Sequence, residues 1–131
     1  MELVITSKVL QSLEDFRAQR KFEPIEVNHP AFDQPILDYI GAPNETVRAK
    51  CEEGINILVD SLISGIKENP NKAFVLDVFR EKLEYFRDED TEEIEQATGY
   101  CEFIMDILNI ESSDGVLNSF IYGFDPMSEQ P

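Results

Sequence analysis

Histidine and cysteine are scarce in this sequence of 131 residues, which contains one histidine and two cysteines. Hydrolytic catalysis by serine or cysteine usually needs a basic side chain beside the nucleophile, and His29 is the one histidine that could fill that role. Cys51 and Cys101 lie far apart and have no CxxC partner, so a zinc or redox site is not indicated. A helical di-iron centre needs two Glu-x-x-His pairs, which a chain with one histidine cannot supply. The sequence therefore predicts no catalytic residue, no metal site and no cofactor.

Basic residues are also few, because 11 Lys and Arg stand against 27 Asp and Glu, for a net charge of −16. A field of this sign repels nucleic-acid phosphates and anionic lipid headgroups. We therefore expect no nucleic-acid partner and no membrane partner. A basic protein partner is favoured, and high solubility is the alternative explanation of the same acidity.

Long apolar runs are missing as well. No stretch approaches the roughly 18 apolar residues of a membrane span. The first residues lack the basic region and the long apolar region of a signal peptide. We expect a cytoplasmic protein, in which Cys51 and Cys101 are buried thiols without a disulfide.

Apolar residues at helical spacing are what the chain does contain. The length suits one domain over residues 1–131, and stripes with spacings of three and four predict amphipathic helices. Each stripe follows a polar residue whose side chain can accept a hydrogen bond from a free amide of the first helical turn. The predicted long helices are 6–22, 45–68, 71–88 and 91–109. Their candidate caps are Thr6 or Ser7, Asn44, Asn71, and Asp90 or Thr91.

Proline interrupts the helical pattern over residues 23–44, which carry four of the seven prolines. Each proline restricts the residue before it away from the helical region. The segment therefore predicts a proline-rich crossover between the first two long helices. One short helix fits from Pro35 to Ile40, with Gly41 as its stop. The apolar residues of this segment indicate that it wraps the core.

The last part of the chain, residues 112–126, fits a helix or a strand. The spacing of Val116, Leu117, Phe120 and Ile121 favours a short helix, which Ser112 or Ser113 would cap and Gly123 would stop. Residues 126–131 are expected to fray. The fold class that follows is all-α, a single-domain bundle of about five helices.

The segments Gly115-Val116-Leu117-Asn118 and Tyr122-Gly123-Phe124 follow an acidic helix pair. In this layout the chain resembles small bacterial all-helical domains of unknown function. The resemblance implies a helical fold in a bacterial protein. It implies no activity, because no functional residue comes with it.

Negative charge is densest between Glu81 and Glu102, where nine acidic residues stand against two basic ones. Clustered charge of one sign speeds encounter and selects partners. We therefore predict a docking face for a basic protein, as in an immunity protein, an inhibitor or an adaptor. A solvated pair of helix faces would carry the same charges. The predicted partner-binding residues are Glu81, Glu84, Asp88, Glu89, Asp90, Glu92, Glu93 and Glu95.

Two other classes of function stay open. The chain could be an accessory or structural homo-oligomeric domain without activity of its own. It could also be a carboxylate-based enzyme or a weak metal binder, since Asp60, Asp77 and Asp106 lie close to apolar stripes. A calcium loop over residues 88–99 is not supported, because Glu93 and Gly99 stand where an EF-hand has glycine and glutamate.

Overall fold

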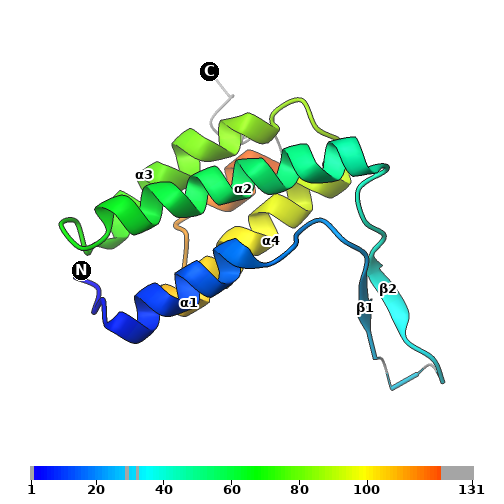
Figure 1. Ribbon diagram of the computed structural model, residues 1–131, viewed down its shortest axis with the longest axis horizontal. Coiled ribbons are helices and arrows are strands. Elements are labelled where there is room, and N and C mark those ends of the chain that lie inside the picture. The colour runs from blue at the N-terminus through cyan, green and yellow to red at the C-terminus, as the bar shows by residue number, and fades with distance from the viewer. Residues whose placement is uncertain (1, 29, 32, 122–131) are drawn as a thin grey trace.

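Five α-helices and one short β-hairpin make up the part of the chain that the structure describes, residues 2–28, 30–31 and 33–121 of a computed structural model (Figure 1). The predicted all-α class with about five helices is confirmed. The elements in chain order are α1 (Ser7–Ala18), β1 (Ile25–Val27), β2 (Ile36–Tyr39), α2 (Glu45–Gly65), α3 (Lys72–Leu83), the 3₁₀ helix η1 (Glu84–Phe86), α4 (Thr91–Leu108) and α5 (Val116–Ile121).

Side-chain caps begin three of the helices where the sequence predicts them. The Thr6 hydroxyl accepts from the amide of Val9 at 3.1 Å and begins α1. The side-chain oxygens of Asn44 and Asn71 accept in the same way, at 2.9 and 2.8 Å, at the first turns of α2 and α3. Asp90 occupies the cap position of α4, although its side chain makes no capping hydrogen bond.

The first helix ends at Ala18, four residues before the predicted end. Gln19 is already extended, and Phe22 has a φ of +62°, in the left-handed region. The amide of Phe22 donates to the hydroxyl of Tyr100 on α4 at 2.8 Å. The left-handed turn buries the Phe22 ring completely, and we attribute the early end of the helix to this tertiary contact.

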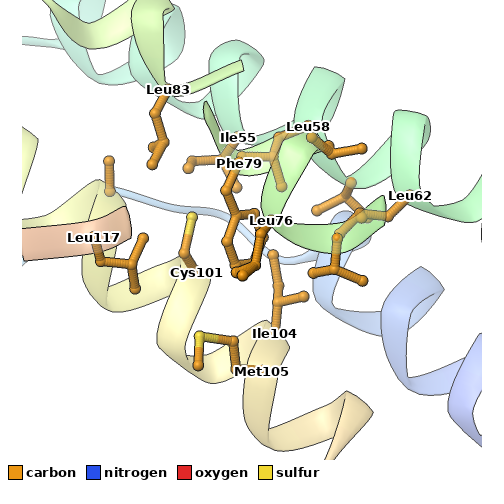
Figure 2. Close-up of a cluster of buried hydrophobic side chains, with 14 of the residues drawn as sticks. Ile55, Leu58, Leu62, Leu76, Phe79, Leu83, Cys101, Ile104, Met105 and Leu117 are labelled. Carbon is orange, nitrogen blue, oxygen red and sulfur yellow. The ribbon is translucent and has the colours of Figure 1, made fainter. Parts of the chain in front are cut away.

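Helix α2 lies at the centre of the bundle and packs against α1, α3 and α4 (Figure 1). The buried side chains of all five helices form one hydrophobic core, part of which is drawn in Figure 2. A Cβ atom on Gly54 would lie 2.4 Å from a ring carbon of Tyr85, and one on Gly65 would lie 2.5 Å from the ring of Phe74. Both glycines of α2 therefore permit aromatic rings of η1 and α3 to approach the helix closely.

The segment between α1 and α2 contains an antiparallel hairpin in place of the predicted short helix. Strand β2 covers residues 36–39 and pairs with β1 in the register Val27 with Ile36 and Glu26 with Leu37. The prediction of a helix over residues 35–40 was wrong. A helix of so few residues fixes many dihedral angles for few hydrogen bonds, whereas the β-branched residues of both strands suit an extended backbone.

The chain end confirms the helix that the spacing favours, since Val116–Ile121 forms α5 against α3 and α4. The proposed stop at Gly123 and the tail 126–131 lie outside the described residues. None of the described helices combines the length and the apolar character that crossing a membrane requires.

Candidate functional site

The eight acidic residues of the predicted docking face do not lie on one free surface. Glu81 and Glu84 are exposed, but each forms an ion pair with a nearby residue of the chain, Lys82 and Arg87 respectively. Pairing with Arg87 lowers the pKa of the Glu84 carboxyl. These two carboxylates are therefore partly neutralised within the chain.

Glu89 ties the α3–α4 turn to helix α2. Its largely buried carboxylate lies 2.7 Å from the ammonium of Lys50. The hydrogen bond and the charge of Glu89 raise the pKa of Lys50. Glu89 thus has a partner inside the molecule and contributes little to a surface field.

Glu93 is buried, with an exposed fraction of 3%. Its carboxylate accepts a hydrogen bond of 2.8 Å from the hydroxyl of Tyr39 at the end of strand β2. The pKa of Tyr39 is raised, first by burial and then by this bond to Glu93. Glu93 also lies in the first turn of α4, where the helix dipole favours negative charge. It therefore fastens the base of the hairpin to the beginning of α4.

Replacing Tyr39 by phenylalanine is expected to lower the free energy of unfolding by about 1–3 kcal/mol, because the buried Glu93 carboxylate loses its donor. Chemical denaturation followed by circular dichroism measures the change. Tyr85→Phe is the matched control, since the Tyr85 hydroxyl donates to the Lys50 carbonyl at an exposed position where water replaces it. Equal losses of unfolding free energy in the two variants would show that the Tyr39–Glu93 bond stabilises the fold no more than an exposed hydrogen bond does.

Four of the eight predicted residues remain as an exposed group at the α3–α4 turn and the first turns of α4. None of them forms an ion pair with any described residue. They are Asp88, Asp90, Glu92 and Glu95.

The hairpin brings a second acidic surface, which the sequence reasoning missed, to the same end of the bundle. Residues 22–44 contain four acidic residues and neither Lys nor Arg. The hairpin leaves the bundle where α2 and α4 begin (Figure 1), and the Tyr39–Glu93 bond holds it there. We call this surface the acidic end. Its members are Glu26, Asp33, Asp38, Asp88, Asp90, Glu92 and Glu95.

Apolar side chains lie exposed among these acids. Leu37 is 53% exposed, Ile40 is 63% exposed and Val27 is 37% exposed. The alternation of Ile25, Glu26 and Val27 after Pro24, together with the lack of Lys and Arg in this segment, was the available signal. It is weak, because short apolar runs fit a helix or a strand equally well.

The cations nearest the hairpin are already bonded. Arg48 is buried and donates to Glu45 at 2.8 Å, to Glu52 at 3.0 Å and to the carbonyl of Lys21 at 2.9 Å. Pairing with Arg48 lowers the pKa of Glu45 to about 2. Arg20 pairs with Glu23 and Glu45. The bonds of these cations hold the chain segments on either side of the hairpin in place. They do not neutralise the exposed acidic residues of the hairpin.

The hypotheses of a carboxylate-based enzyme and of a metal binder find less support in the geometry. Asp60, Asp77 and Asp106 are exposed, and the first two pair with Arg17 and Arg80. Within the described ranges, no three His, Cys, Asp or Glu side chains gather in a way that could hold a metal ion. His29 lies outside these ranges.

Both cysteines are buried, as predicted. Burial, with the charges of Glu89 and Glu93, raises the pKa of Cys51 to about 12. Burial also raises the pKa of Cys101. Since the thiolate is the nucleophile, neither thiol is poised to react.

A hollow of about 490 Å³ opens beside α3. Its charged groups are paired, Lys72 with Asp114 and Arg80 with Asp77. No described cation of the hollow is therefore left to bind a small anion.

Fold and surface together define a small acidic helical domain that carries one projecting β-hairpin. The chain belongs to the family described as "Domain of unknown function (DUF4844)", whose model matches residues 4–125. It is also similar to the crystal structure of a DUF3571 family protein from Acinetobacter baumannii AYE. That match has 30% sequence identity and a TM-score of 0.70, and it covers 89% of this chain and 90% of the other. No curated protein matches the sequence.

Proposed function

We propose that this domain is a protein-interaction module that binds a basic protein through the acidic end. The observation that carries the proposal is the juxtaposition of exposed Leu37 and Ile40 with acidic residues that form no ion pair with any described residue. Protein interfaces commonly combine an apolar centre with a polar rim. Charge of one sign around that centre steers a partner of the opposite sign.

An immunity protein, an inhibitor and an adaptor would all use such a surface, and we propose a role of this kind in the cytoplasm. The buried thiols of Cys51 and Cys101 suit a reducing compartment. The net charge of −16 favours a basic protein over a nucleic acid or an anionic membrane.

The test is affinity capture from a lysate of the source organism at low salt, followed by binding measurements with the purified captured protein. The variant Asp88→Lys/Glu92→Lys/Glu95→Lys reverses charge at the acidic end. It leaves Glu89 and Glu93 unchanged because their side chains hold the fold together. We expect the dissociation constant for a basic partner to rise by about tenfold or more, since rim charges act on encounter and salt dependence.

The matched control is Glu14→Lys/Glu68→Lys/Glu111→Lys. These residues are exposed, and Glu68 and Glu111 follow the far ends of α2 and α4. Both variants change the net charge equally. Several hundred millimolar salt should release the partner from the wild type and the control, because exposed charge pairs are screened on that scale. Equal weakening in both variants would leave only a general charge effect and would refute the proposal.

Retention of no basic protein would also refute it. The mass of the protein in light scattering is the second readout. A discrete oligomer that persists in salt, with no partner captured, would favour the accessory homo-oligomeric domain instead.

A further inference from the structure

The hairpin has an open edge on each strand. The sheet contains β1 and β2 alone within the described residues, so each strand has a neighbour on one side only. An unpaired strand edge presents a row of backbone donors and acceptors that can pair with another chain. Recognition by strand addition uses such an edge for affinity and uses alternate side-chain positions for specificity.

Strand β2 offers the better edge of the two. It carries Leu37 and runs into Ile40, and both are more exposed than Val27 of β1. In the view of Figure 1, β1 lies on the side of the helices and β2 faces away from them. The register steps from Ile25 with Tyr39 to Glu26 with Leu37, so Asp38 is an extra residue in β2, whereas Ile36 and Leu37 pair regularly with Val27 and Glu26.

The charge of the hairpin decides what kind of chain fits this edge. Residues 22–44 carry four acids without a single Lys or Arg, and Glu26, Asp33 and Asp38 are exposed. Among the features that protect native edges from pairing, the hairpin has short strands and the irregularity at Asp38, but it lacks lysine. A second copy of the chain would bring Asp38 and its neighbours against the same acids, and like charges directly opposite each other in a sheet are destabilising. The complementary occupant is a basic strand.

We infer that the partner contributes an extended segment, in which Lys or Arg alternates with apolar residues, and that this segment adds to the free edge of β2 as a third strand. The apolar side chains cover Leu37 and Ile40, and the cations meet the exposed acids of the hairpin. This inference rests on the proposed function and names the part of the partner that the acidic end recognises.

The probe is a short synthetic peptide of alternating Lys and Val with a fluorescent label. Fluorescence anisotropy gives its affinity for the full chain. Backbone amide spectra and amide hydrogen exchange give its position. We expect shifts and new protection concentrated at residues 36–40. A peptide of the same sequence with alternate amides N-methylated keeps the charge and loses backbone donors, so it should bind about tenfold more weakly if strand pairing provides the affinity.

The matched protein variants are Leu37→Ser/Ile40→Ser and Val4→Ser. All three positions are exposed, but Val4 precedes α1 and lies outside the hairpin. The hairpin variant should weaken peptide binding by about fivefold or more through lost apolar contact, while Val4→Ser should leave it unchanged. Unchanged melting curves would show that both variants fold.

Equal affinity for the N-methylated peptide, or protection outside residues 36–40, would overturn strand addition and leave charge attraction alone. A doubling of mass in light scattering that Leu37→Ser/Ile40→Ser abolishes would identify a second copy as the occupant and would also overturn it. A natural partner that responds to charge reversal at Asp88, Glu92 and Glu95, but not to the hairpin variant, would overturn this inference and leave the proposed function standing.

Discussion

Replacing Phe79 by alanine is expected to lower the free energy of unfolding by about 3–5 kcal/mol, the usual cost of removing a fully buried aromatic ring. Phe79 lies on α3 and is completely buried. Figure 2 shows it in the middle of the cluster, with Ile55 of α2, Ile104 of α4 and Leu117 of α5 around it. Helices from three other parts of the chain therefore lose contacts at once, and the cavity that remains cannot close without moving all of them.

Urea denaturation monitored by circular dichroism measures this change. A domain of this size has about 5–15 kcal/mol of stability in total, so the variant should be close to unfolding at elevated temperature. Phe103→Ala is the matched control, because Phe103 lies on α4 with nearly half of its surface exposed and contacts Phe16. Similar losses for the two phenylalanines would contradict the central position of Phe79.

Replacing Lys21 by methionine is expected to lower the free energy of unfolding by about 2 kcal/mol at pH 7, because buried acceptors lose their donor. Lys21 is 1% exposed. Its ammonium donates to the carbonyls of Phe16, Arg17 and Gln19 at 2.7, 3.1 and 2.8 Å and to the side chain of Asn56 at 2.9 Å. Two of these carbonyls belong to the last turn of α1, so the lysine side chain adds to the backbone cap, in which the amide of Gln19 donates to the carbonyl of Phe16 at 3.1 Å.

Stability should also depend on pH through Lys21. Burial lowers the pKa of Lys21 from 10.5 to about 8, so between these values the unfolded chain binds more protons than the folded one. Folding stability therefore rises with pH in this window. The burial penalty of the charged form is fully present below pH 8 and is relieved as the pH approaches 10.5.

Denaturation of the wild type and of Lys21→Met from pH 7 to 10.5 checks the sign. We expect the stability difference between them to widen in favour of the wild type as the pH rises. Lys67→Met, at an exposed position after α2, serves as the control and should show no such trend. A constant difference would mean that folding leaves the pKa of Lys21 at its ordinary value, and a difference that narrows with pH would mean that the four acceptors raise it.

The sequence allowed accurate prediction of where helices begin. Thr6, Asn44 and Asn71 each accept from an amide three residues away, and an interaction over so short a distance along the chain can be read from a pattern. The apolar stripe of α2 was equally informative, since Ile55, Leu58 and Leu62 are all buried. Helical periodicity and burial follow from the same geometry of 3.6 residues per turn.

The candidate site was predictable only in part. Asp88, Asp90, Glu92 and Glu95 are exposed as expected, whereas Glu93 is buried and Glu89 is paired with Lys50. All six lie in one acidic run, and their residue types alone do not distinguish the buried or paired carboxylates from the exposed ones. The partner that distinguishes Glu93 is Tyr39, 54 residues earlier in the chain.

By itself, the sequence determined the helical class, the helix starts, the buried stripes and the acidity, because each depends on the residue types or on neighbours within one or two turns. Only the tertiary structure decided that residues 36–39 form a strand, that α1 stops at Ala18, and which carboxylates of the acidic run stay in water. Those outcomes depend on contacts between distant segments, such as Phe22 with Tyr100. Burial against such a contact outweighs the small intrinsic preferences that a short segment has for helix or strand.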